Sequence, residues 1–241
     1  AEKLLREALA LDPENHQARV RLARTFVTAG DRAKAVKLAD EYGALFRIPR
    51  LAAAPVIDGD PTDAAWSQGW SGELKYLNTY RWWGKPCQGK SRFYIGHRDG
   101  KIYLTVLGYE DDLSKLVVKH KNRDDRIWED DCVELFFDPE CSEKDDYQFV
   151  INAGGGLADM YQKQEKPDMK CEYAAKVFPD RGYWACEFAV AAEDLGGQKM
   201  TADSIWGMNI VRTRIGPASE CCSYWPMFGQ NQNNFLFPLA V

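Results

Sequence analysis

The stretch SRFYIGHR-DG-KIYLTVL, residues 91–107, contains two alternating runs that are joined by Asp99-Gly100. Alternation of apolar and polar residues with a period of two is typical of a strand with one buried face. Asp-Gly between two such runs is a strong hairpin signal, because a type I′ turn needs a positive φ at both central residues. We therefore predict antiparallel strands over 91–98 and 101–107.

Outward from this hairpin, further stretches carry strand patterns and few are helical. The strand candidates are residues 132–138, 147–153, 172–178, 183–190, 205–213 and 234–240. Many strands at short spacing indicate an antiparallel β-sandwich. The fold class is therefore mainly β, and residues 56–241 are enough for one such domain.

The N-terminal residues follow a different pattern, dominated by the strong helix formers Ala, Leu, Lys, Arg and Glu. Residues near Leu4 match residues near Leu38 at an offset of 34, the period of the tetratricopeptide repeat, which this segment resembles. We predict a helical segment over 1–48, a linker over 49–55 and the sandwich beyond it. The resemblance implies a protein partner, but a structural spacer is an equal alternative.

Composition excludes several classes of function. The net charge of -5 lacks the basic footprint of a nucleic-acid binder. No apolar run approaches the roughly 20 residues that a membrane-spanning helix needs. No signal peptide is visible in the chain. The 30 aromatic residues (8 Trp, 11 Tyr and 11 Phe) are the more informative feature, because aromatic rings are suited to ligand contacts.

The cysteine content sets a limit on disulfide bonding. The chain has 7 Cys, and an odd number excludes a fully paired intramolecular framework. The pattern C-x-x-C is absent, which argues against a zinc knuckle. Adjacent Cys221 and Cys222 allow two interpretations: a strained vicinal disulfide, or two reduced thiols of which one faces the core.

The block WEDDCVELFFD, residues 128–138, predicts a strand with two different faces. Alternation places Val133, Leu135 and Phe137 on a core face, and Cys132, Glu134, Phe136 and Asp138 on the other. An indole contacts the C–H groups of a sugar, and a carboxylate accepts two of its hydroxyls. Trp128 and Glu134 are thus candidates for half of a saccharide site. The alternatives are a tryptophan folded over the edge of the core and a solvated glutamate.

Six blocks in order resemble the family 9 carbohydrate-binding modules, which are jelly-roll-like β-sandwiches related to the DOMON-like folds. The blocks are 56–66, 103–111, 128–138, 147–152, 183–196 and 206–212. The resemblance implies non-catalytic binding of a poly- or oligosaccharide. It also implies an extracytoplasmic setting, in which the module targets a larger protein to a glycan.

The resemblance also implies site residues. The family holds a sugar between two tryptophans, of which Trp128 matches the first, and Trp225 or Phe228 is available as the second. Glu134 and Asn209 match polar residues of the family site, and Asn152 and Arg212 are further candidates. Val150 and Val211 stand where the family pattern has an arginine and a glutamine, and Arg212 points to the opposite face if its strand is regular.

The family also carries structural calcium, which takes six to eight oxygen ligands. We favour Glu110 and Asp111, which follow a predicted strand, as ligands. Further donors are available in Asp112, Asp124, Asp125, Asp130 and Asp131. The alternative is a solvated acidic surface.

Two other functions stay open. The chain is a protein-interaction scaffold that binds no sugar, or it is part of a glycan-degrading hydrolase. Hydrolysis needs two carboxylates across the scissile bond. Glu187 with Glu129 or Asp131 could form such a pair, but nothing in the sequence singles them out.

Overall fold

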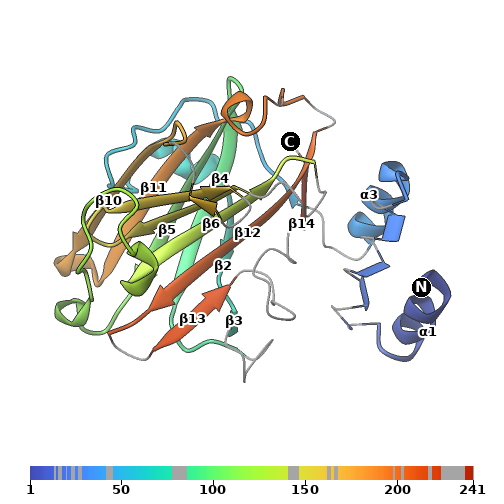
Figure 1. Ribbon diagram of the computed structural model, residues 1–241, viewed down its shortest axis with the longest axis horizontal. Helices are drawn as coiled ribbons and strands as arrows, with labels where there is room; N and C mark the ends of the chain where they lie inside the picture. Colours follow the sequence, from blue (N-terminus) through green and yellow to red (C-terminus); the bar gives the residue numbers. More distant parts are fainter. Residues whose placement is uncertain are drawn as a thin grey trace.

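A computed structural model gives the fold. It describes residues 1–241 except 14, 16, 17, 20, 23, 24, 27, 28, 42–45, 78–85, 141–146, 162, 163, 166, 167, 198, 202, 203, 217, 218, 224–236 and 241. Two β-sheets face each other and helices lie at one side of them (Figure 1). The predicted mainly-β sandwich with an N-terminal helical segment is confirmed.

The smaller sheet contains five antiparallel strands among the described residues, in the order β10-β11-β5-β4-β2. Their bounds are β2 (Trp70–Glu73), β4 (Ser91–Arg98), β5 (Lys101–Tyr109), β10 (Glu172–Phe178) and β11 (Tyr183–Ala191). The predicted turn between β4 and β5 is present, with positive φ at both Asp99 (49°) and Gly100 (77°).

The larger sheet contains nine strands in the described part of the chain. Its main path is β1-β14-β12-β6-β7-β8-β9, and β13 joins β12 to β3. The bounds are β1 (Phe46–Arg47), β3 (Tyr76–Leu77), β6 (Cys132–Asp138), β7 (Tyr147–Asn152), β8 (Leu157–Tyr161), β9 (Gln164–Glu165), β12 (Ile205–Arg214), β13 (Glu220–Ser223) and β14 (Phe237–Ala240). Short 3-10 helices connect the strands: η1 (Ala64–Gln68), η2 (Leu113–Lys115), η3 (Ile127–Glu129), η4 (Pro179–Arg181) and η5 (Ala192–Asp194).

One continuous apolar core fills the space between the sheets. Val133, Leu135 and Phe137 of β6 face into it, as the alternation predicts. Phe188 of β11 packs against Phe137 at 6.0 Å and against Phe149 at 4.8 Å between ring centroids. These side chains are fully buried, so the inward faces of β6 and β11 hold the two sheets together.

The helical segment has a small core of its own. α1 (Glu2–Leu11) and α3 (Arg32–Glu41) enclose Leu9, Leu22, Phe26 and Leu38, which are all buried. Leu22 and Phe26 are four residues apart and share one helical face. Within the described part of the chain, no helix is both long and apolar enough to cross a membrane.

The chain between the helices and the sandwich is partly built into the sheets. β1 pairs in parallel with β14. Leu51 is fully buried and its N–H bonds to the carbonyl oxygen of His97 at 2.9 Å. Further along, the buried carboxylate of Glu187 accepts bonds from the N–H groups of Asp58 and Gly59 and from the Trp66 indole. Residues 49–51 of the predicted linker therefore belong to the sandwich.

Candidate functional site

The face of the larger sheet that points away from the core carries a group of buried polar side chains. In the register of the sheet, Glu134 of β6 lies between Val150 of β7 and Val211 of β12. The next rung places Asn209 and Gln148 on either side of Phe136. Paired residues of neighbouring strands share a face, so Glu134 and Asn209 lie on one face.

Glu134 is the chemically most unusual member of this group. Its side chain is only 4 % exposed. It accepts hydrogen bonds from Gln148 Nε2 at 2.7 Å and from Thr213 Oγ1 at 3.3 Å. Burial raises the pKa of Glu134 to about 7, against a weaker opposing effect of these two bonds. The apolar neighbours Val150 and Val211 explain the desolvation, because neither can hydrate or pair with the charge.

Trp128 lies beside this face and not within the core. It belongs to η3, where its neighbour Ile127 is fully buried against Cys132, Val150 and Ala158. Since Ile127 anchors η3 on the outer surface of β6 and β7, Trp128 is held at the border of the polar group. Its side chain is 37 % exposed, which leaves part of the indole accessible to a ligand.

Asn152 lies on the same outer face, but its side-chain amide makes all of its hydrogen bonds with the loops around it. Its Nδ2 donates to the His120 carbonyl at 2.7 Å and to Asp130 Oδ2 at 2.8 Å. Its Oδ1 accepts from the N–H groups of Gly154 and Gly156. These four bonds use the hydrogen-bonding capacity of a side-chain amide. Asn152 therefore organises loops, and its predicted role as a sugar ligand does not fit this geometry.

Arg212 points to the opposite face, and its predicted role as a sugar ligand is wrong for that reason. The side chain is 0 % exposed and lies between the sheets, over the Trp184 ring. Its guanidinium pairs with Glu110 and also donates to Ser91 Oγ and to the Lys90 carbonyl. A regular β12 causes this orientation, since Arg212 and Val211 are neighbours in sequence.

Glu110 and Asp111 do not fit the predicted calcium site. Both carboxylate oxygens of Glu110 accept from guanidinium groups: one from Arg212 and Arg214, the other from Arg214. The positive charges of Arg212 and Arg214 beside Glu110 oppose the binding of a calcium ion there. Asp111 is exposed.

The other predicted calcium donors hold loops together. Asp112, Asp124, Asp125, Asp130 and Asp131 each accept at least one backbone N–H group. Such bonds stabilise the carboxylate without a metal ion. Calcium binding itself stays a prediction.

The predicted second stacking residues, Trp225 and Phe228, lie outside the described residues. Two residues that the sequence analysis missed, Gln148 and Thr213, bond directly to Glu134. Alternation along β7 could have indicated Gln148, because it places this residue on the face that points away from its core neighbour Phe149. Its pairing with Glu134 depends on the register between two strands, which the sequence does not give.

The two sheets define the class of the molecule: a β-sandwich with the fold of the carbohydrate-binding modules. It is similar to a presumed carbohydrate-binding protein from Bacteroides uniformis ATCC 8492, with a TM-score of 0.63 and 15 % identity, over 81 % of this chain and 98 % of that one. It is also similar to a family 9 carbohydrate-binding module from Caldicellulosiruptor kristjanssonii. In complex with cellotriose that module gives a TM-score of 0.59, 14 % identity, and coverage of 81 % and 92 %.

The same module in complex with glucose gives a TM-score of 0.59, 15 % identity, and coverage of 81 % and 94 %. These similarities confirm the fold of the family 9 modules for the sandwich. Residues 1–54 match the tetratricopeptide repeat family model, which confirms the predicted resemblance of the helical segment. A search of curated proteins finds no match to the chain.

Proposed function

We propose that the sandwich binds a saccharide, without catalysis, on the outer face of its larger sheet. The observation that carries the proposal is the buried carboxylate of Glu134, bonded to Gln148 and Thr213 on a face bordered by the accessible indole of Trp128. The fold supports it, since the similar solved modules are in complex with cellotriose and glucose.

In this proposal Trp128 stacks on the C–H face of a sugar ring, and Glu134 accepts its hydroxyl protons in hydrogen bonds. Gln148 and Thr213 orient the carboxylate through the bonds they already make. A charge-assisted bond in a desolvated site is stronger than one in water. Val150 and Val211 are fully buried on both sides of Glu134, so they desolvate its carboxylate.

The module would hold a larger protein on a poly- or oligosaccharide outside the cytoplasm, as an accessory to other domains. A scaffold that binds a protein is the second candidate, and the helical repeat over 1–54 favours it. In this second candidate no sugar binds to the sandwich.

Calorimetric titration with mono- and oligosaccharides tests the proposal. We expect binding of at least one sugar and a loss of affinity of about tenfold or more in Trp128→Ala, since stacking and its apolar contact contribute about 1–3 kcal/mol. Val56→Ala is the control, because Val56 is 62 % exposed and lies in the segment anchored on the other sheet. Unchanged affinity in folded Trp128→Ala would remove Trp128 from the site. Failure of every sugar to bind would favour the scaffold.

A further inference from the structure

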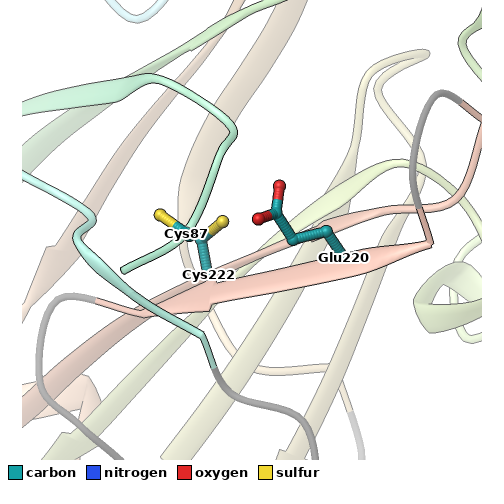
Figure 2. A group of neighbouring side chains, drawn as sticks. All are labelled: Cys87, Glu220 and Cys222. Carbon is teal, nitrogen blue, oxygen red and sulfur yellow. The ribbon is translucent and has the colours of Figure 1, made fainter. Parts of the chain in front are cut away.

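Cys87 and Cys222 bring their sulfur atoms together at one edge of the core. Cys222 lies on β13 and is fully buried, and Cys87 lies just before β4 and is partly buried. The two Sγ atoms and a carboxylate oxygen of Glu220 all lie within 4.8 Å of one another. Figure 2 shows the two sulfur atoms side by side, with the Glu220 carboxylate next to them.

The backbone holds both cysteines in place. The N–H of Cys87 bonds to the carbonyl of Lys75 at 2.9 Å, and the N–H of Lys75 bonds to the carbonyl of Ser223 at 3.0 Å. Cys222 itself pairs with Leu77 of β3. The chain around residues 74–77 therefore connects the two cysteines through main-chain bonds, which fixes their separation without help from side chains.

The third member of the group is not available to a metal ion. Glu220 accepts the N–H groups of Gln88 and Gly89 and pairs with the guanidinium of Arg214. The guanidinium of Arg214 and the two N–H groups therefore already compensate its negative charge. Two thiols remain, which are too few for the four ligands of a structural zinc site.

The two thiols differ in reactivity. A hydrogen bond from the Cys222 thiol lowers the pKa of Cys87, and the same bond together with burial raises the pKa of Cys222. The thiolate is the reactive form in disulfide exchange. Cys87, which is also the more accessible of the two, is therefore the first to react.

We propose that Cys87 and Cys222 form an intramolecular disulfide by exchange with an external disulfide such as oxidised glutathione. The Cys87 thiolate attacks the external S–S bond, which breaks and releases one thiolate. Cys222 then loses its proton to that thiolate and attacks Cys87 Sγ, which expels the second thiolate. The second thiolate takes up from solvent the proton that Cys87 released when it ionised. The protein loses two electrons and two protons, and the external disulfide becomes two thiols.

The position of this disulfide gives it a structural consequence. It would join β13 to the chain before β4, across 134 intervening residues. In sequence, Cys87 follows the pair Trp82-Trp83, and Cys222 precedes Trp225 by three residues. The covalent bond would therefore fix the distance between β13 and the chain before β4.

Equilibration of the full chain in oxidised and reduced glutathione buffers tests the proposal. After alkylation and proteolysis, mass spectrometry should find a Cys87–Cys222 cross-linked peptide that reduction removes. Closing a loop of this length in the unfolded chain should raise the Tm of the oxidised protein by about 5 °C or more. The comparison uses one unchanged chain in two redox states, so it does not depend on whether a variant folds.

Cys221→Ser is the matched control, because Cys221 neighbours Cys222 but lies on the other face of β13 beside Thr213. It should keep both the cross-link and the increase in Tm, and Cys87→Ser should lose both. An absent cross-link, or one that Cys221→Ser abolishes, would overturn the proposal. A chelator-sensitive increase in Tm on addition of Zn²⁺ to the reduced protein would overturn it in favour of a metal site.

Discussion

At the scale of single residues, the buried carboxyl group of Glu134 has a cost to folding that depends on pH. The unfolded carboxyl has a pKa near 4.5, and burial raises it to about 7 in the folded protein. Between these two values the folded state binds more protons than the unfolded state. The free energy of unfolding therefore falls as the pH rises through this window, and the loss is complete above it.

Glu134→Gln should remove this loss, because an amide of the same shape does not ionise. We expect the variant to exceed the wild type in stability by up to roughly 3 kcal/mol at about pH 8, and to equal it below about pH 4.5. Urea unfolding at both pH values measures the difference. Glu129→Gln is the control, since the Glu129 side chain is 48 % exposed. Equal stability of Glu134→Gln and wild type at both pH values would contradict a raised pKa of Glu134 in the folded protein.

At the scale of elements, the loops next to β6 and β7 depend on a few side chains that replace regular pairing. Asn152 joins the turn after β7 to the segment around His120, and Asp130 accepts from the N–H groups of Lys119 and His120. These loops support η3, and with it Trp128. The position of the accessible indole therefore depends on polar contacts well below the surface.

Asn152→Ala should destabilise these loops without changing the strand pairing of the sheet. Four hydrogen bonds disappear and buried backbone groups lose their partners, so we expect a loss of about 2–4 kcal/mol in the free energy of unfolding. Denaturant titration checks the value, with Asn122→Ala as the control because Asn122 is exposed. A loss below about 0.5 kcal/mol would show that the loops hold without Asn152.

The same elements show how far the sequence predicts the structure. The β4–β5 hairpin follows from Asp99-Gly100, and the core face of β6 follows from alternation. The short strands β3 and β13 carry too few residues for a period to be recognisable. The roles of Asn152 and Cys87 depend on partners far away in the chain, and alternation says nothing about which loop closes over which residue.

At the scale of the whole molecule, a network of buried charges connects the two sheets. Glu110 at the end of β5 pairs with Arg212 and Arg214 of β12, and Arg214 continues to Glu220 of β13. Alternation along a regular β12 places Arg212 on the inward face, but it does not show that Glu110 meets it there, because that pairing depends on how the sheets stack.

Arg212→Ala should destabilise the sandwich by about 3–5 kcal/mol, because it leaves a cavity beside Trp184 and removes one of the two cations that compensate Glu110. Thermal or urea unfolding measures the loss. Arg92→Ala is the control, because the Arg92 side chain is 50 % exposed and its ion pair with Glu73 is long, at 3.9 Å. Similar losses in the two variants would show that the buried network contributes no more than a surface pair.

The parallel pairing of β1 with β14, followed by the bonds of residues 49–51 to His97, has a mechanical consequence. A pull on the helices along this segment loads its hydrogen bonds together, in shear, and does not peel them apart one by one. If the outer face were held and the helices were pulled, the force would therefore reach the sheets before the hydrogen bonds of β1 and residues 49–51 break.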